Sequence, residues 1–456
     1  MKQIFTLLIA SCSLVSCNLY KNYERPEIAE RSTENLFRDA IASDTASFGN
    51  MPWREVFTDP QLQTLIGKAL TQNTDMKKAD LTIEKARIPL TLSKLAYLPS
   101  MALAPQGSIS SFDGSKATKT YTLPLSVSWE IGSWGNLRNN LKKAGVLEMQ
   151  AKAGKQATQT AIISAVANLY FTLQMLDAQL QTTNETIVLW KKNVETMEAM
   201  QVAAMTTNAA VAQTKANYYE LLTTVPTLEN SIRQAENALC MLLNEAPHAI
   251  SRSAFNADCF PQTLSAGVPA QLLSNRPDVR LAELQLASAF YDTNIARSAF
   301  YPSLTISGLA GWTNSAGSAV INPAKFIAQA AASVVQPLFA QGKIRGNLQL
   351  AKLTEEELTL DFRQTLLTAG QEVSDALSSY QTAIRKQESR EKEVEQLQTA
   401  LSKTEDLFKY TNSTTYLEKL TAQQSLLNAQ LSLISDKYAR VQAAISLYQA
   451  LGGGRN

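Results

Sequence analysis

The sequence predicts a mainly α-helical chain that also contributes strands to a membrane β-barrel. Three observations support this fold class: an export signal that ends at a cysteine, a second half that repeats the first, and alternating segments between long helical stretches. The chain of 456 residues is long enough for two or three average domains, or for one architecture built from long elements. We therefore expect an internally duplicated protein with coiled-coil-like helices and four transmembrane β-strands.

Residues 1–16 have the features of a lipoprotein signal peptide. Lys2 precedes an apolar run, 4–15, that is too short to span a bilayer. Ser16 and Cys17 then form the end of a lipobox, in which the cysteine thiol of bacterial lipoproteins receives a diacylglyceryl group. We predict acylation of Cys17, the alternative being an ordinary signal peptide with an incidental cysteine. In lipoproteins that this chain resembles, Asp at the next position favours the inner membrane, so Asn18 favours the outer membrane.

The composition argues against several functional classes. Lys plus Arg number 42 and Asp plus Glu number 40, so no charge excess suggests a nucleic acid partner. His248, the single histidine, lies in a predicted turn, and the chain lacks Cys-x-x-Cys, Gly-x-Gly-x-x-Gly and Walker motifs. We expect no enzyme activity, no catalytic residues, no cofactor and no metal site. Cys240 and Cys259 remain in the mature chain, and the sequence leaves open whether they form a disulfide.

The second half of the chain repeats the first. Gly135-Asn136-Leu137-Arg138 recurs, 207 residues later, as Gly342-Lys343-Ile344-Arg345. An apolar stripe with the four-and-three spacing of a coiled-coil seam also recurs with this shift. Its first copy is Ile162, Val166, Leu169, Leu173, Leu176 and Leu180, and its second copy is Ala369, Val373, Ala376, Tyr380, Ala383 and Gln387.

Each half is predicted to contain the same elements in the same order. The first helix covers 59–98 or 275–301, with a capping residue and a proline at its start and a proline after its end. Two extended segments follow. A long helix then runs from about 134 to 200 or 341 to 408, and a second helix covers about 209–244 or 414–451. Three glycines, 452–454, stop the last helix.

The extended segments decide the predicted compartment. Every odd residue over 121–131 is apolar, which is the length and alternation of a membrane-spanning strand. The pattern recurs over 304–312, is weaker over 101–109, and is assigned over 326–335 by symmetry only. A half-buried sheet in a soluble domain would show the same alternation, but the lipobox favours lipid exposure. We expect the loops at 112–119 and 314–323 to lie at the outer face.

Four strands cannot close a barrel, and open strand edges are not tolerated in hydrocarbon. Membrane barrels begin at eight strands. Two copies of the chain would give eight strands and little lumen, whereas three copies would give twelve strands and a pore. The sequence therefore requires a shared barrel, or else the membrane interpretation is wrong.

Together these features resemble the outer membrane efflux protein family, and in particular its lipidated branch. The most specific segments are 275–283, which begins Asn-Arg-Pro-Asp, 296–303, 447–454 and Tyr23-x-Arg25-Pro26. The resemblance implies a homotrimer with a twelve-stranded barrel in the outer membrane and an α-barrel in the periplasm. It implies a passive exit duct for small toxic compounds or drugs. The expected partners are a periplasmic adaptor, or membrane fusion protein, and an inner-membrane pump of the resistance-nodulation-division (RND) type.

The resemblance also suggests a domain organisation. We expect a lipidated and equatorial segment at 17–58, a first repeat at 59–245, an equatorial linker at 246–270 and a second repeat at 271–456. An exit duct for type I polypeptide secretion and a structural lipoprotein that spans the envelope are the alternative functions. The lipid anchor and the Arg-Pro-Asp motif favour efflux, and the transported compound is expected to be selected by the pump.

A periplasmic gate is implied at the turn between the last two helices, where members of the family close like an iris. The candidate gate residues are Tyr410, Tyr416, Leu417, Glu418 and Thr421. Leu417 would form an apolar ring with Glu418 nearest the axis, and the two tyrosines would donate hydrogen bonds. Better-known members have Asp where this chain has Thr421, which counts against an acidic ring there. Glu418 is otherwise only a solvated helix charge, like its neighbour Lys419.

Overall fold

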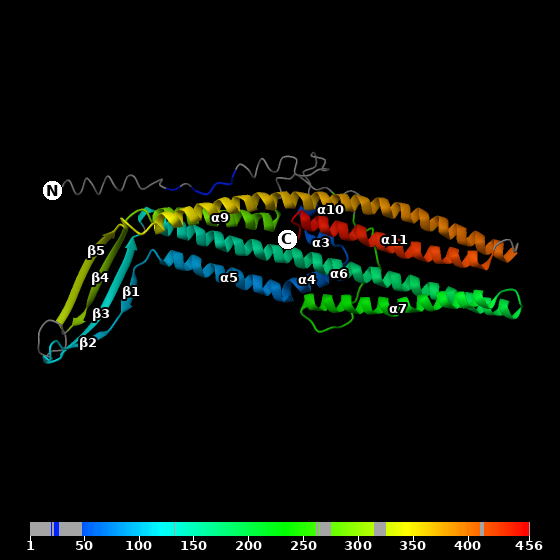
Figure 1. The fold of residues 1–456 in the computed structure, drawn as a ribbon, viewed down its shortest axis with the longest axis horizontal. Coiled ribbons are helices and arrows are strands. Elements are labelled where there is room, and N and C mark those ends of the chain that lie inside the picture. Colours follow the sequence, from blue (N-terminus) through cyan, green and yellow to red (C-terminus); the bar gives the residue numbers. More distant parts are fainter. Residues whose placement is uncertain are drawn as a thin grey trace. The chain divides into compact units, whose positions relative to one another are not determined.

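The computed structural model describes residues 20, 22–26, 48–131, 133–260, 264, 275–313, 325–410 and 415–455. These residues fall into two compact units, and each unit combines segments from both halves of the sequence. Unit 1 contains 81–152, 281–364 and the described residues before 27, whereas unit 2 contains 48–80, 153–280 and 365–455 within the described ranges. Figure 1 shows the elements of both units as a ribbon.

Unit 1 contains an antiparallel sheet. β1 (Ser100–Leu103) and β2 (Gln106–Ser110) both pair with β3 (Thr118–Ile131). β3 pairs in turn with β4 (Ser303–Thr313), which pairs with β5 (Lys325–Val335). The predicted strands over 121–131 and 304–312 are confirmed, as is the segment at 326–335 that was assigned by symmetry only. The weaker segment at 101–109 is also extended, but it is divided into two strands, β1 and β2, so the sheet has five strands rather than four.

The strand register gives this sheet one apolar face and one polar face. Trp129 lies opposite Ile306, and Ile306 lies opposite Ala332, so apolar side chains align across three strands. One residue along, Ser128 pairs with Ser307 on the other face. The apolar face is open, since Trp129 is 40% exposed and Leu125 is 44% exposed. This arrangement suits a sheet that meets lipid on one side and water on the other.

Four helices meet the sheet at one end (Figure 1). α5 (Thr74–Leu95) leads into β1, and α9 (Pro277–Ser298) leads into β4. α6 (Asn136–Val202) follows β3, and α10 (Lys343–Tyr410) follows β5. α6 and α9 are joined by the ion pair of Lys143 with Asp292, at 2.7 Å, and by a small apolar cluster around Tyr291.

Unit 2 contains the remainder of these helices together with η1 (Phe48–Asn50), α3 (Trp53–Val56), α4 (Pro60–Gln72), α7 (Asn208–Leu243) and α11 (Tyr416–Ala450). α4 begins as predicted, with Asp59 accepting a hydrogen bond from the backbone amide of Gln61. The predicted single helix over 59–98 is wrong, because the structure breaks it at Asn73. The Asn73 side chain accepts from the Asp75 amide and donates to the Leu242 carbonyl, so it replaces helical hydrogen bonds there.

The long helices and their stripes are confirmed. α6 has 67 residues and α10 has 68. Val166 and Leu173 of the first stripe and Ala369 and Val373 of the second are fully buried. Gln387, the polar end of the second stripe, is also buried, at 7% exposure. The four-and-three spacing therefore identified the packed face of both helices.

Two segments outside the long helices pack against α6 and α11 in unit 2. The rings of Phe48 and Phe57 both contact Tyr448 of α11 edge to face. Arg252, beyond α7, pairs with Asp177 on α6 and Glu236 on α7. These contacts tie the inter-repeat segment to the first repeat.

The two mature-chain cysteines are free thiols in this structure. Cys240 is fully buried in α7, and its sulfur lies 3.4 Å from Nδ1 of His248. His248 lies in the turn that was predicted after a helix. Burial raises the pKa of the Cys259 thiol to about 11, so this thiol is protonated at neutral pH.

Candidate functional site

The candidate gate residues lie at the end of unit 2 where α6 meets the beginning of α11, and two of them, Tyr416 and Glu418, make specific contacts there. Tyr416 is buried, and its hydroxyl donates to the Asn193 carbonyl of α6 at 3.2 Å. Its ring packs against Phe408 and joins an apolar cluster that links α6, α7 and α11. The buried members of this cluster are Trp190, Met197, Val211, Leu221, Tyr416, Leu420 and Leu427. Tyr416 therefore joins the two helical hairpins within one chain.

Glu418 takes part in the start of α11. Its carboxylate accepts from the Thr415 backbone amide, and the Thr415 hydroxyl accepts from the Glu418 amide, which is a capping box. Lys419 is paired with Glu405 of α10 at 3.3 Å. Both charged side chains therefore make specific contacts.

The other candidate gate residues lie at the surface. Leu417 is 65% exposed and Tyr410 is 71% exposed. The ammonium of Lys409 lies 5.1 Å from the centre of the Tyr410 ring. Thr421 donates its hydroxyl proton to the Leu417 carbonyl one turn earlier. Residues 411–414, the turn itself, lie outside the described residues.

A buried pair of amides beside these residues was not predicted from the sequence. The Asn193 side chain donates to the Gln423 side chain, and both residues are less than 10% exposed. Gln423 occupies a position in the spacing 416, 420, 423 and 427, which otherwise contains Tyr and Leu. A polar residue at one such position can fix the register of two helices. This interruption of an apolar stripe was the signal that could have revealed the pair.

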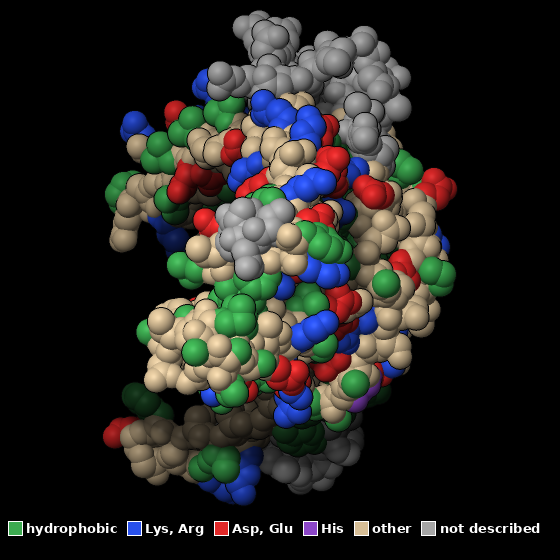
Figure 2. All heavy atoms as spheres, turned by 90° about the vertical axis from the view of Figure 1, so that its right-hand side faces the viewer, with side chains coloured by type: hydrophobic (Ala, Val, Ile, Leu, Met, Phe, Trp, Pro, Cys, Tyr) green, Lys and Arg blue, Asp and Glu red, His purple; other side chains and the backbone are tan. Residues whose placement is uncertain are grey.

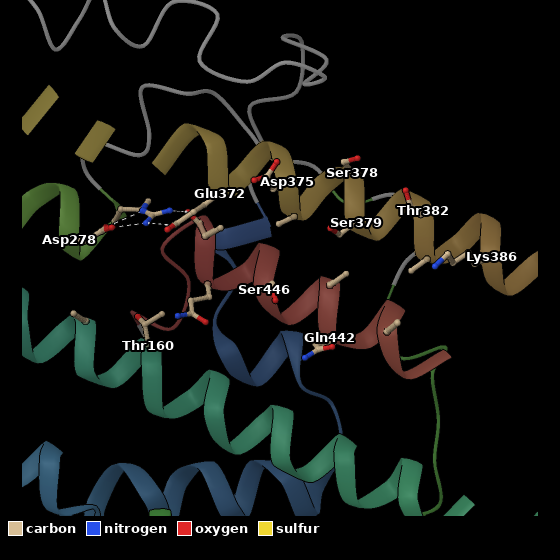
Figure 3. Close-up of a pocket in the computed structure, with 18 of the residues that line it drawn as sticks. Thr160, Asp278, Glu372, Asp375, Ser378, Ser379, Thr382, Lys386, Gln442 and Ser446 are labelled. Carbon is tan, nitrogen blue, oxygen red and sulfur yellow. Dashed lines mark hydrogen bonds and ion pairs between the residues drawn. The ribbon is translucent and has the colours of Figure 1, made fainter. Parts of the chain in front are cut away.

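A groove between α10 and α11 contains the Asn-Arg-Pro-Asp motif. It has a volume of about 950 Å³, and Figure 3 shows Ser379 and Lys386 of α10 facing Gln442 and Ser446 of α11 across it. Arg276 is buried at one end, where it pairs with Asp278 and Glu372 at 2.6 Å. The second repeat therefore starts at the wall of this groove.

Arg276 also secures the end of α11. Its guanidinium donates to the Ala450 carbonyl at 3.0 Å, which satisfies a carbonyl of the last helical turn. Burial favours the neutral form of Asp278, but hydrogen bonds and charge from Arg276 outweigh burial and lower the pKa of this carboxyl. Gly452 has a φ of 75°, and a Cβ there would lie 2.6 Å from the Asn275 carbonyl oxygen. Only glycine fits this close approach.

The predicted lipidation site, Cys17, lies outside the described residues, but the chain shortly after it is described. The Tyr20 ring lies against Gly135, where a Cβ would be 2.7 Å from a ring carbon. Arg25 forms a bidentate ion pair with Glu283 of α9 at 2.8 Å. We call residues 20–26, as far as they are described, the N-terminal strap. It runs along α6 and α9 of unit 1.

Charges of both signs are distributed over the surface. Figure 2 shows Lys and Arg side chains intermixed with Asp and Glu on the face in view. Within the described residues, no group of three or more His, Cys, Asp and Glu side chains is placed to hold a metal ion.

Comparison with known proteins agrees on one family. The family model described as outer membrane efflux protein matches residues 65–245 and again 268–453. The cation efflux system protein CusC of Escherichia coli (strain K12) is 27% identical over 445 residues, which cover 97% of each chain. The probable outer membrane lipoprotein SilC of Salmonella typhimurium is 26% identical over 461 residues, which cover 99% of each chain. A crystal structure of CusC superposes with a TM-score of 0.86 at 26% identity, covering 96% of this chain and all of that one.

Proposed function

The chain belongs to the outer membrane efflux protein family, and from this premise we propose that three copies join edge to edge into one transmembrane duct. It is the outer-membrane exit component of a tripartite efflux system, which also includes a periplasmic adaptor and an inner-membrane pump. The pump of the proposed system is of the RND type. We also propose how the copies close into a duct, how the duct is anchored to the membrane and how it is gated.

The main evidence for a ring of copies is that the two edges of the sheet differ. Three copies would supply enough strands to enclose a pore. Among the described residues, β5 pairs only with β4, while β1 and β2 pair only with β3. Each unpaired backbone group at a strand edge in hydrocarbon costs roughly several kcal/mol, so both edges of the sheet require partners. Because the edges differ, each must pair with the opposite edge of a neighbouring copy, and such head-to-tail contacts close into rings.

Two apolar stripes on the helices of unit 1 support the same closure. α5 exposes Ile88, Leu92 and Leu95, and α10 exposes Leu350 and Leu353, each more than half accessible. Their spacing of three and four residues aligns them on one face of each helix. Packing α5 of one copy against α10 of the next would bury both stripes.

Native mass measurement of the detergent-extracted protein tests this assembly and should give three copies. Leu92→Glu and Leu353→Glu should each weaken the trimer, since they place charges in the proposed seam. Val202→Glu is the control, because Val202 is 91% exposed at the end of α6. A monomer that stays folded and membrane-inserted would contradict the shared barrel.

We further propose that Cys17 is acylated and anchors the strap to the membrane. Three peptide bonds separate Cys17 from Tyr20, so their Cα atoms lie at most about 11 Å apart. Tyr20 packs against Gly135, directly after the last residues of β3, which is where the sheet would leave the bilayer. Palmitate should label the wild type and not Cys17→Ser, and label retained by the variant would refute the proposal. The variant should still insert, because the strands have their own affinity for lipid.

The proposed gate consists of Leu417, Glu418 and Thr421, with Tyr410 and Tyr416 restraining the helices. Single-channel conductance tests it. Glu418→Gln keeps a capping-box side chain while removing the charge, so it should weaken cation selectivity and divalent block without melting α11. Leu417→Ser and Tyr410→Phe should each raise conductance, the first by wetting an apolar constriction. If all three variants conduct like the wild type, the gate lies elsewhere.

The polar face of the sheet supports a duct with little selectivity of its own. Apart from Lys325, whose side chain is not described, Glu130 is the one charged side chain on this face among the described strands. The remaining residues are mainly Ser, Thr, Gly, Ala and Gln. We propose that small toxic compounds pass this wall after selection by the pump.

A further inference from the structure

Basic side chains gather where the four helices of unit 1 meet the sheet. The helix segments 87–95, 136–147, 289–298 and 343–354 contain nine Lys and Arg residues and one acidic residue. The nine are Arg87, Lys94, Arg138, Lys142, Lys143, Arg297, Lys343, Arg345 and Lys352, and the acid is Asp292. Because the whole chain has a net charge of only +2, this excess is local.

The cations nearest the sheet are those without a carboxylate partner. Arg87 pairs with Glu148, and Lys143 pairs with Asp292. We call Lys94, Arg138, Lys142, Arg297, Lys343 and Arg345 the cationic collar, and within the described chain none of the six forms an ion pair. The nearest acidic side chain on the strands, Glu130, belongs to the polar face of β3. Within the described residues, the six cations of the collar are therefore not paired with carboxylates.

Helix capping does not account for the whole collar. Lys94 and Arg297 lie in the last turns of α5 and α9, where the helix dipole stabilises cations. Arg138 and Arg345 are the third residues of α6 and α10, where the dipole opposes a cation. Burial, and then the charge of Arg138, lower the pKa of Lys142, as expected for cations held close together.

The repeated motif places these two arginines equivalently in both halves. Gly135 and Gly342 have φ values of 80° and 78°, and the residues before them, Trp134 and Gln341, are also at positive φ. Two residues at positive φ therefore precede each helix, and the arginine is the third residue of the helix in both halves. The motif is thus used twice at the edge of the membrane-facing region.

The strap indicates that the collar lies on the bilayer side of the proposed duct and not on its lumen side. Lys142 donates to the Asn22 side chain of the strap at 2.6 Å, and Tyr20 lies close enough to Arg297 to be influenced by its charge. Because the strap continues to the cysteine that we propose to be acylated, it must run on the bilayer side of the duct. Trp134 stacks on Tyr301 at 5.3 Å beside it, and aromatic side chains favour the membrane interface.

We propose that the cationic collar binds anionic phospholipid headgroups of the periplasmic leaflet of the outer membrane. The phosphodiester oxygens supply the anionic partners that the described residues do not provide for these six cations, and the acyl chains lie along the apolar face of the sheet. This inference rests on the proposed membrane placement of the duct. Each cation close to an anionic lipid surface strengthens binding by about fivefold.

The test measures lipid binding to the full-length, delipidated protein by native mass spectrometry. Phosphatidylglycerol and phosphatidylethanolamine are compared at equal concentration and low salt. We expect a preference of at least roughly tenfold for phosphatidylglycerol, which weakens as salt rises. The combined variant Arg138→Gln, Lys142→Gln, Arg297→Gln and Arg345→Gln should lose this preference.

The matched control removes four exposed cations of unit 2 that have no ion pair in the described chain: Lys191→Gln, Lys192→Gln, Arg233→Gln and Lys403→Gln. It should keep the preference. Equal binding of both lipids by the wild type, or an unchanged preference in the collar variant, would overturn the inference. Trimer mass and channel conductance are recorded on the same samples. If the wild type forms conducting trimers but shows no lipid preference, only the proposed lipid binding is refuted. If the wild type forms no conducting trimers, the proposed duct is refuted.

A second readout distinguishes lipid binding from a role in the pore. If the collar variant changes the anion-to-cation permeability ratio while lipid preference persists, the cations line the lumen and the inference is wrong. Glycerophosphoglycerol, which carries the phosphodiester of phosphatidylglycerol without acyl chains, should not displace the lipid at equal concentration. Displacement by it would show that the site takes free phosphate esters.

Discussion

The long helices α6 and α10 bury the same stripe positions with different side chains. In α6 the stripe is aliphatic, and Val166 and Leu173 are completely buried. In α10 the equivalent positions include small alanines, Tyr380 and finally Gln387, all buried as well. The two helices therefore bury equivalent positions, but the side chains at these positions differ.

Arg440 contacts the two stripe positions of α10 that carry polar groups, Tyr380 and Gln387. It is a buried residue of α11 that donates to Gln387 of α10 and to the Phe260 carbonyl of the inter-repeat segment. It also contacts Tyr380 and pairs with Asp258, so these groups raise the pKa of its guanidinium although burial acts to lower it. The polar residues of the α10 stripe are therefore accommodated in a buried position because a cation of α11 contacts them.

The largest expected effect comes from removing that cation. Arg440→Met should destabilise the protein by about 3 kcal/mol, because it leaves the buried Gln387 and Phe260 oxygens without donors. The double variant Arg440→Met, Gln387→Leu should recover about half of the loss, because it makes the α10 stripe apolar like that of α6. Chemical unfolding in detergent, followed by circular dichroism, gives both values.

Arg390→Met is the control for this cycle. Arg390 also pairs with a residue of α11, Asp436, but its side chain is 33% exposed. Its loss should cost less than about 1 kcal/mol. Equal destabilisation by Arg440→Met and Arg390→Met would show that burial of the cation is not the important difference.

The next largest effect distinguishes the two copies of the glycine motif. Gly342→Ala should cost about 1 kcal/mol, because its Cβ meets no atom within 4 Å and only the positive φ is unfavourable. Gly135→Ala has the same backbone cost and in addition a Cβ that would overlap the Tyr20 ring. It should therefore displace the strap.

Hydrogen exchange of residues 22–26 measures that displacement. Exchange should accelerate in Gly135→Ala and remain as in the wild type in Gly342→Ala. Equal exchange in the two variants would mean that Tyr20 does not depend on Gly135. Such a result would remove one support for placing the lipid anchor at the start of α6.

An effect of similar size is expected where the first-repeat hairpin contacts the second. Gln423→Leu leaves the buried Asn193 amide without its acceptor and should weaken the α6–α11 contact by about 1–2 kcal/mol. The proposed gate should then open more often and conduct more in planar bilayers. The double variant Asn193→Leu, Gln423→Leu should restore low conductance. Gln424→Leu, whose amide donates to Asn428 on the same helix, is the control and should conduct like the wild type.

The sequence predicted those parts of the fold that depend on short-range periodicity. The alternation over 121–131 and the stripe through α6 could be recognised because each has one continuous apolar face. The break at Asn73 could not, because it depends on the Leu242 carbonyl of another helix. The same holds for Gln387, whose side-chain oxygen accepts a hydrogen bond from Arg440 of α11, and for Tyr416, whose acceptor lies on α6. Contacts between distant segments are invisible to local patterns.

The smallest expected effect is a dependence on pH at the start of each repeat. Asp59 begins the first repeat and Asp278 the second, and both carboxyls have a lowered pKa. At Asp59, burial acts to raise the pKa, but hydrogen bonds from Ser253 and Tyr170 outweigh it. A carboxyl with a lowered folded-state pKa stabilises the protein above its unfolded value, 3.8, and this contribution is lost as pH falls through the folded pKa.

Unfolding measured from pH 7 down to pH 3 should show this loss, and each of the two variants should remove part of it. Asp59→Asn retains a capping side chain at the start of α4, so it isolates the charge from the cap. Asp278→Asn should change the slope by less than about 1 kcal/mol over this range, because the side chain is 47% exposed and solvent screens its pairing with Arg276. Arg276 also retains Glu372, which limits the loss further. An unchanged pH slope in both variants would assign acid sensitivity to other carboxylates.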